Sequence, residues 1–393
     1  MLKRVLAIGS SAAVVGALLT GVMAGPAAAA DVNCPTASGS LNGDGSADTP
    51  FLISSKEDLQ EFRTDSSYWG SGGSPSYTRI TKNIGMGSCT WSSVIGTASS
   101  PFFGEVDGGG FQITGLDISG DDTYIGLFGI TGTDTYIKDL TFTGDVVNAK
   151  TADFNYTGGL IGYATNDTRV TNAHASGNVS GSSQVGGLIG YAVGTSGTVL
   201  VEDSSATGVV SGSTVVGGLI GYAQVVSISN TYARGDVSAS GATAGGLVGQ
   251  VSNTVTLSDS YSTGNVTVES GTPGGLSGLG SPDTTTDSYW DTETSQGEGP
   301  VGVGTGKTTA ELQDISTFSN WEIASGYDAL STWGICSAVN DGYPFLTGAY
   351  SSDPCASGSG GTTGSTPPAR YTFIFKLPDG RTCTSISPVT VVD

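Results

Sequence analysis

The chain has 393 residues, with 14 Lys and Arg against 35 Asp and Glu, so its formal net charge is −21. This balance argues against nucleic acid, anionic lipid and acidic polysaccharide as partners, since each needs basic side chains to neutralise it. The 63 glycines follow no Gly-X-Y period, which excludes a collagen helix. Only 12% of the residues are charged, and the Ser, Thr and Asn background is typical of a secreted protein.

Residues 1–30 are predicted to be a secretory signal peptide. Lys3 and Arg4 precede an apolar run from Val5 to Ala24, and three alanines then lead to a cleavage site ahead of Asp31. The alternative is an uncleaved anchor, because the run is long enough to span a bilayer. Cleavage removes Lys3 and Arg4, so 12 of the 14 basic residues remain and the charge becomes −23. No membrane span is expected in the mature chain.

The cysteines lie near the two ends of the chain and none lies in the middle. In an exported protein this pattern favours disulfides that staple the ends. We expect one bond between Cys34 and Cys89 and another between Cys336 and Cys355, because each pair falls within one terminal segment. Cys383 is then left over; it is free, replaces Cys336 or Cys355 in their bond, or pairs between chains.

Residues 31–115 are predicted to form an N-terminal cap. Ser55 can cap a helix that runs to Phe62, with Asp58 supplying a short capping box. Residues 77–85 alternate like a strand. A turn is expected at 107–109 between two further strands.

Residues 116–290 contain a repeat with a period of about 30 residues. Its first half reads G-G-L-I-G-Y and starts at Gly158, Gly186, Gly217 and Gly245, with a decayed copy at Gly274. Its second half reads N/D-x-x-A-x-G-x-V, and length varies only at two bends. Such periods are typical of stacked units that cannot bury their apolar faces alone.

The repeat predicts an all-β fold, a parallel, right-handed β-helix or β-solenoid with one coil per unit. Its glycines are expected to supply positive φ or close backbone approach at corners. An antiparallel sandwich is the alternative. Equivalent residues should stack in ladders. Two ladders are expected to face inward: a leucine ladder of Leu127, Leu160, Leu188, Leu219, Leu247 and Leu276, and a valine ladder of Val146, Val179, Val210, Val237 and Val266. An Asx ladder is expected at a corner and consists of Asp139, Asn172, Asp203, Asn230 and Asp259.

The pattern breaks after Asp291. Residues 291–350 are predicted to form a mixed α/β C-terminal cap, with a T-x-x-E helix start at Thr308 and a compact aromatic set, because an open coil edge invites aggregation. Residues 351–370 form a Gly/Ser/Thr/Pro linker. Residues 371–393 are expected to form a small β-hairpin tail around the turn at 378–380.

The G-G-L-I-G-Y units resemble the GLUG repeat, named for its Gly-Leu-x-Gly core. Asp107-Gly108, with the preceding Pro101–Gly104, and Gly342–Leu346 resemble the segments that flank the repeats in that family. The resemblance implies a secreted or surface-attached bacterial protein of β-helix type, often adhesin-like. It implies no reaction and carries over no catalytic residue.

No catalytic or metal constellation stands out in the sequence, and no cofactor is expected. The single histidine, His174, has Thr, Ser and Tyr at the equivalent repeat positions, which favours a structural role. Asp121 and Asp122 are read as a solvated turn. The stretch 42–48 is read as a turn, since it lacks the spacing of a calcium loop. A polysaccharide-active enzyme of glycoside hydrolase or lyase type remains the alternative, and needs carboxylates that converge on one wall.

Recurring tyrosines form the candidate ligand platform: Tyr163, Tyr191, Tyr222, Tyr232 and Tyr261. If the rings face outward they offer a surface for a glycan or a surface protein; if they face inward they are core. The leading hypothesis is a secreted or cell-surface, non-enzymatic binding or scaffold module. A structural spacer whose tail engages another protein is a third possibility.

Overall fold

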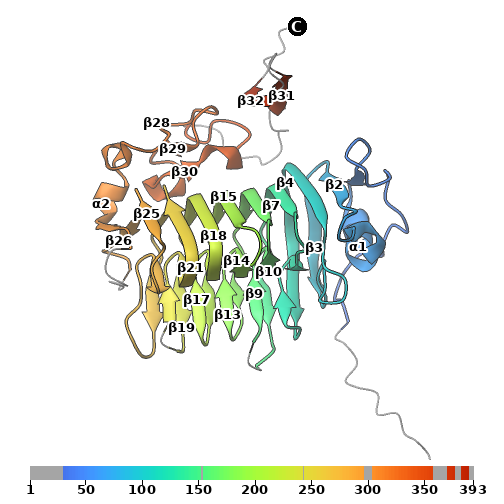
Figure 1. Ribbon diagram of the computed structural model, residues 1–393, viewed down its shortest axis with the longest axis horizontal. Coiled ribbons are helices and arrows are strands. Elements are labelled where there is room, and N and C mark those ends of the chain that lie inside the picture. The colour runs from blue at the N-terminus through green and yellow to red at the C-terminus, as the bar shows by residue number, and fades with distance from the viewer. Residues whose placement is uncertain are drawn as a thin grey trace, which may run out of the picture.

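The computed structural model describes residues 30–151, 154–241, 243–295 and 303–356, together with the backbone of β31 (Arg370–Lys376) and β32 (Thr382–Pro388). The chain forms a parallel β-solenoid of about eight turns, as the repeat predicted (Figure 1). The predicted signal peptide and most of the predicted linker lie outside the described residues. The right-handed winding and the division into domains stay predictions.

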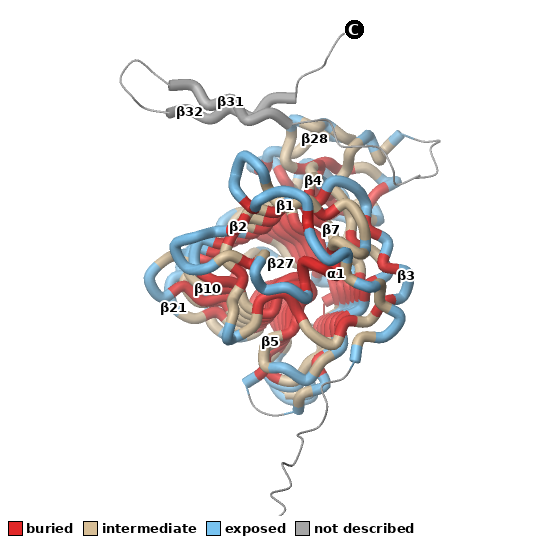
Figure 2. Tube along the Cα trace, turned by 90° about the vertical axis from the view of Figure 1, so that its right-hand side faces the viewer, coloured by how far each residue is buried: buried red, intermediate tan, exposed pale blue. Residues whose placement is uncertain are grey.

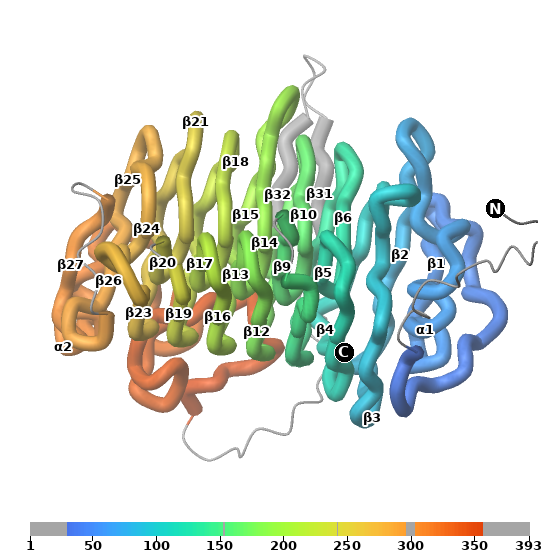
Figure 3. Tube along the Cα trace, turned by 90° about the horizontal axis from the view of Figure 1, so that it is seen from below, coloured from blue at the N-terminus to red at the C-terminus, as the bar shows by residue number. Residues whose placement is uncertain are grey.

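Each repeat forms one coil of short strands. In one coil these are β9 (Tyr156–Gly158), β10 (Ile161–Thr165), β11 (Arg169–Ala175) and β12 (Val179–Ser180). Each strand pairs in parallel with its equivalent in the next coil, and Figure 3 shows the coils side by side in sequence order. The other coil strands are β5 (Tyr124–Ile125), β6 (Phe128–Ile130), β7 (Tyr136–Phe142), β8 (Val146–Asn148), β13 (Gln184–Gly186), β14 (Ile189–Val193), β15 (Val199–Ala206), β16 (Val210–Gly212), β17 (Val215–Gly217), β18 (Ile220–Ala233), β19 (Val237–Ala239), β20 (Thr243–Gly245), β21 (Val248–Ser258), β22 (Tyr261–Ser262), β23 (Val266–Val268), β24 (Ser277–Leu279), β25 (Thr284–Thr286) and β26 (Tyr289–Asp291).

The N-terminal part feeds directly into the same sheet. It contains β1 (Phe51–Ile53), α1 (Lys56–Thr64), β2 (Ser76–Ile80) and β3 (Ile84–Trp91), and both β2 and β3 pair in parallel with β4 (Gly104–Gly120). Ser55 caps α1 as predicted, whereas the Asp58 carboxylate accepts from Ser54 rather than from the cap residue.

The predicted turn at 107–109 is wrong, because β4 continues through it as one strand of 17 residues. Its pairing with β7 shifts register between Asp107 and Phe111, and Gly109 and Gly110 have φ of 62° and 74°. The N–H of Gly109 donates to Asp107 Oδ1. These residues therefore make a bulged corner within a coil, not a hairpin that reverses the chain.

The core runs the length of the solenoid (Figure 2). Every member of the predicted leucine ladder and valine ladder is at most 1% exposed, as is Ile161 beside them. A fully buried aliphatic side chain contributes about 1.5–3 kcal/mol. Stacking of coils is therefore what stabilises each coil.

Asx residues and glycines have different roles in the coil: the Asx residues adopt positive φ at a corner, and the glycines allow close backbone approach. All five predicted corner Asx residues adopt positive φ, between 47° and 53°, and Asn172 Nδ2 donates to Asp139 Oδ1 at 2.7 Å. The described glycines of the G-G-L-I-G copies have no positive φ, so that part of the expectation is wrong. They are needed for close approach instead: a Cβ on Gly158 would lie 2.1 Å from the Ile161 carbonyl oxygen. A Cβ on Gly208 would lie 1.9 Å from the Gly177 carbonyl oxygen.

The segment after β26, residues 303–356, is called the C-terminal segment below. It contains β27 (Thr305–Lys307), α2 (Thr309–Leu312), β28 (Ile323–Ser325), β29 (Trp333–Ile335) and β30 (Phe345–Leu346), and Thr308 and Glu311 form the predicted capping box. We expected it to close the last coil. Only β27 and α2 lie at that end; the rest returns along a side wall above β15 and β18 (Figure 1).

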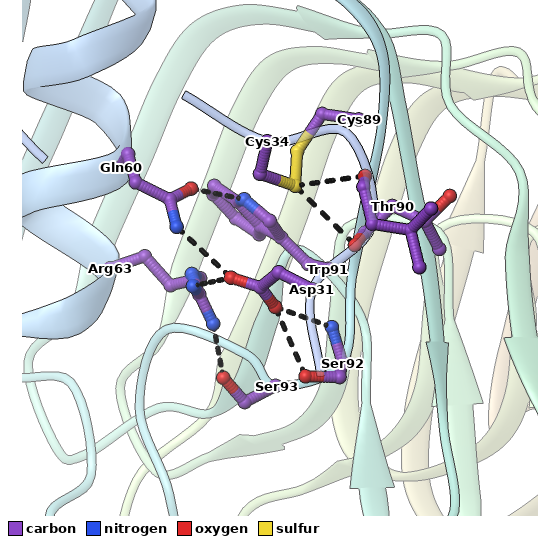
Figure 4. Close-up of a disulfide and its surroundings, with 10 residues drawn as sticks. Asp31, Cys34, Gln60, Arg63, Cys89, Thr90, Trp91, Ser92 and Ser93 are labelled. Atoms are coloured by element: carbon purple, nitrogen blue, oxygen red, sulfur yellow. Dashed lines mark hydrogen bonds and ion pairs between the residues drawn. A yellow bond between two sulfur atoms is a disulfide. The ribbon is translucent and has the colours of Figure 1, made fainter. Parts of the chain in front are cut away.

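Both predicted disulfides are present, Cys34–Cys89 and Cys336–Cys355. Beside the first bond, the carboxylate of Asp31 pairs with Arg63 and accepts from the backbone N–H of Ser92 (Figure 4). The first residue after the predicted cleavage site thus ties α1 to the end of β3. Cys383 lies in β32, which pairs antiparallel with β31 as the hairpin predicted, and its side chain is outside the described part.

Candidate binding surface

Five half-buried tyrosines from four consecutive coils meet on one side of the solenoid. Tyr163, Tyr191 and Tyr222 are equivalent residues on β10, β14 and β18, and Tyr124 and Tyr156 come from β5 and β9. We call this set the tyrosine column. The sequence predicted the first three, while Tyr124 and Tyr156 occupy a different repeat position and were missed.

The rings of the tyrosine column contact one another. Neighbouring centroids are 4.5 to 5.6 Å apart. The Tyr191 and Tyr222 rings lie within 11° of parallel, whereas Tyr191 is tilted by 38° from Tyr156 and by 51° from Tyr163. The Tyr124, Tyr156 and Tyr163 centroids are each 5.6 Å from the other two, so these three rings form a triangle rather than a single file. Because the rings are only half-buried, the column exposes part of its aromatic surface.

Burial raises the pKa of the Tyr191 phenol to about 12, with the neighbouring Tyr222 and Tyr156 phenols adding to the effect. Burial also raises the pKa of Tyr156 and Tyr163. These phenols are therefore neutral at physiological pH, and each hydroxyl can both donate and accept a hydrogen bond.

Phe154 stands next to the column in sequence, two residues before Tyr156, and is 70% exposed. Its φ of 65° is unusual for an aromatic residue. A single exposed apolar side chain is common on protein surfaces, and Phe154 becomes a candidate contact residue because it lies in the bend directly before Tyr156 of the column. The sequence held no signal for it, because Phe154 lies in a bend whose length varies between repeats.

Tyr232 and Tyr261 are buried, at 7% and 0% exposure, so they do not belong to an open platform. They stack at 5.2 Å under Trp333 of the C-terminal segment. The Tyr261 hydroxyl donates to the Pro344 carbonyl at 2.6 Å. These two belong to one in-register row, called the covered row: Thr141, His174, Ser205, Tyr232, Tyr261 and Tyr289.

His174 has a structural environment within the covered row. Its Nδ1 lies 2.9 Å from Ser205 Oγ and its Nε2 lies 3.1 Å from Asn172 Oδ1. Burial lowers its pKa to about 4, so the ring is neutral at physiological pH. It lies beside hydroxyl and amide groups, which hold it in place.

The other polar positions that the sequence singled out are either exposed or bonded to nearby groups. Asp121 and Asp122 are exposed after β4. In the stretch 42–48, Asp44 Oδ1 accepts from the Ser46 N–H, which makes the predicted turn. Asp291 is fully buried and accepts from Thr309 and Tyr343.

One wall does gather carboxylates. Asp107 and Glu202 lie on it in one register row, three strand spacings or about 14 Å apart. Asp139 and Asp203 are two spacings or about 10 Å apart, and Asp139 is bonded to Asn172. These are separations between strand positions, and Asp107 and Asp139 stand only one coil apart, within the span of about 5–9.5 Å at which paired carboxylates flank a glycosidic bond. Both already have partners, however: Asp107 pairs with Arg79 and Asp139 accepts from Asn172.

Within the described ranges, no helix is long and apolar enough to cross a membrane. The two disulfides fit an oxidising, extracellular location.

The fold and its ladders place the chain among the parallel β-solenoid proteins. The family model of the GLUG motif matches residues 155–180, which hold β9 to β12 and so correspond to one coil. The chain therefore carries the GLUG motif that its repeats indicated.

Two relatives share part of this pattern. Halomucin of Haloquadratum walsbyi is 31% identical over 175 residues, which cover 42% of this chain and 2% of halomucin. A protein of Evansella cellulosilytica, provisionally named a Gly-rich membrane protein, is 31% identical over 114 residues, covering 28% of this chain and 13% of that protein. The chain therefore spans only a small part of the length of either relative.

A crystal structure at 1.30 Å resolution from Bacteroides ovatus, provisionally named an immunoglobulin A1 protease, has a similar fold. The TM-score is 0.56 and the identity 20%, over 78% of this chain and 94% of that one. At this identity the likeness shows the fold alone.

Proposed function

We propose that the chain is a secreted or cell-surface, non-enzymatic binding or scaffold module at the bacterial exterior, and that the tyrosine column with Phe154 is its contact surface. The observation that carries the proposal is the cluster of half-buried phenols from four coils, with an exposed phenylalanine two residues before one of them. Tyrosine and phenylalanine are enriched where proteins contact partners. The disulfides and the names of the two relatives support an exterior location.

The partner is a glycan or a surface protein. Because each neutral phenol can both donate and accept a hydrogen bond, the column favours a ligand that offers several hydroxyl or amide groups. A ligand group that does stack would use the exposed Phe154 ring.

The test is a glycan-array screen of residues 31–393, with and without calcium, beside a pull-down with cell-envelope proteins. Binding should fall in the Tyr191→Ser and Phe154→Ser variants. Val209→Ser is the matched control, because Val209 is an exposed apolar residue, 48% accessible, in a different bend of the coil. Equal binding by all three variants would refute the column as the contact surface.

A polysaccharide-active enzyme is the second candidate, because carboxylates do gather on one wall. The bonds that Asp107 makes with Arg79 and that Asp139 makes with Asn172 count against it. Incubation of the protein with bacterial and plant polysaccharides, followed by analysis for new reducing ends or unsaturated products, would detect such an activity. Loss of the product in Glu202→Gln would then place it on this wall.

A further inference from the structure

A polar groove lies between the N-terminal coils and the C-terminal segment, away from the tyrosine column. Its larger hollow measures about 560 Å³ and is roofed by residues 329–332 and 346–348. A second hollow of about 310 Å³ adjoins it, and Tyr136 lines both. Each of these volumes falls within the range of about 300–1,000 Å³ that is typical of ligand sites. The Nδ2 of Asn172 holds the roof by donating to the Gly348 carbonyl at 3.3 Å.

The floor of the groove is a row of outward side chains in register from five coils: Arg79, Asp107, Lys138, Thr171 and Glu202. The same row continues in the later coils as Ser229, Ser258 and Thr286. A parallel row shows a similar change, from Tyr77, Glu105, Tyr136 and Arg169 through Leu200 to Ser227, Thr256 and Thr284. The later coils therefore serve as an internal comparison. They show that small hydroxyl residues at these positions are compatible with a folded coil, whereas the large polar residues lie in the coils that line the groove.

The two hollows are lined by three basic side chains and seven carboxylates, and two of the basic side chains each pair with a carboxylate of the groove. Arg79 Nε lies 3.2 Å from Asp107 Oδ2, and Lys138 Nζ lies 2.6 Å from Glu105 Oε1. Burial alone would lower the pKa of Lys138, but the hydrogen bond and charge of Glu105 outweigh it, and the pKa is raised. Lys138 therefore stays charged and fixed. The Lys138 ammonium also lies 5.1 Å from the Tyr136 ring centre.

We propose that this groove is a binding site for a neutral saccharide chain. Each sugar hydroxyl both donates and accepts, so it can bond to a carboxylate and a cation that already neutralise each other. An anionic sugar would meet Glu202, Asp139 and Asp203 at one end of the groove, which repel it. The Tyr136 ring at the junction of the hollows supplies an aromatic surface for a sugar ring. This proposal goes beyond the tyrosine column and does not depend on it.

The experiment is isothermal titration of residues 31–393 with neutral hexasaccharides of glucose, mannose, galactose and N-acetylglucosamine. A galacturonate hexamer and a glucosamine hexamer serve as anionic and cationic probes. We expect at least one neutral hexamer to bind. Tyr136→Ser and Glu202→Ser should each weaken its binding about tenfold. Both substitutions place in the groove the residue type that the later coils carry, so the coils should still fold.

Val209→Ser, at an exposed position outside both the groove and the tyrosine column, should leave this affinity unchanged. A loss that occurs in the groove variants but not in Val209→Ser assigns the binding to the groove. Binding of only the charged hexamers, no binding of any neutral hexamer, or wild-type affinity in both groove variants would each overturn the proposal. Circular dichroism of each variant confirms that a loss is not caused by misfolding.

Discussion

The tyrosine column and the covered row are built by the same repeat, yet they have opposite surroundings. Both are rows of polar or aromatic side chains that point out of the coil wall, and both stack at about the coil spacing. Tyr191 and Tyr222 stay half-buried, whereas Tyr232 and Tyr261 are covered by the C-terminal segment. A repeat therefore determines where a ladder stands, and the non-repetitive segment determines whether that ladder is surface or core.

The largest expected effect is that of Tyr261→Ala. The Tyr261 ring is fully buried and stacks with Tyr232, and its hydroxyl accepts a hydrogen bond from Asn340 Nδ2 at 2.7 Å. Removal of a buried aromatic ring costs about 3–5 kcal/mol. The free energy of unfolding from denaturant titration should fall by this amount. A loss no greater than that of Tyr222→Ala would show that the C-terminal segment does not cover the row in solution.

The next effect concerns the Cys336–Cys355 bond, which closes a sequence separation of 19 within the C-terminal segment. Its removal by Cys336→Ser with Cys355→Ser should cost about 3 kcal/mol. The loss should loosen the cover, so iodide should quench Trp321 and Trp333 fluorescence more strongly. Cys34→Ser with Cys89→Ser is the control, since it affects the other end of the solenoid. Unchanged quenching in the first variant would contradict this role.

Much of the solenoid follows from the sequence, for a physical reason. A coil that stacks on its own copies must place the same residue type at the same point, so Leu127 through Leu276 reveal the inward ladder and the Asx residues reveal a corner. The disulfides followed from the compartment and from the position of the cysteines in two terminal segments.

The candidate sites were harder to predict from the sequence, because they depend on contacts with residues outside the repeats. The burial of Tyr261 comes from Pro344 and Trp333, which are far away in the chain. The groove needs residues 329–332 and 346–348 to return over β7, β11 and β15. One signal was present but unused: the row from Arg79 to Glu202 departs from the Ser and Thr of the later coils.

Acid should probe the covered row through His174. Burial lowers its pKa to about 4, while an unfolded histidine titrates near 6.5. The unfolded state therefore binds more protons between these values, and the stability that the neutral ring provides is present above pH 6.5 and is lost as the pH falls toward 4. Wild type should lose about 2–3 kcal/mol more than His174→Ser between pH 7 and pH 4. Parallel losses in both proteins, by denaturant titration, would rule out a buried neutral ring.

The smallest expected effect is that of Tyr191→Ser in the tyrosine column. The ring stacks on Tyr222 and contacts the tilted ring of Tyr156, but it is only half-buried, so its removal should cost about 1 kcal/mol. The variant should also change the alkaline titration of the neighbouring phenols. The pKa of Tyr156 is raised by burial and by nearby phenols, and a gap in the column lets water reach its ring, so that pKa should fall toward 10. Phenolate absorbance during alkaline titration measures this change.

A raised folded-state pKa stabilises the protein below pH 10, and that stability is lost as the pH rises through the folded value. The variant should therefore lose less stability than wild type above pH 10. If Tyr191→Ser instead costs as much as Tyr261→Ala, the column is core, and the difference in cover between the two rows does not exist.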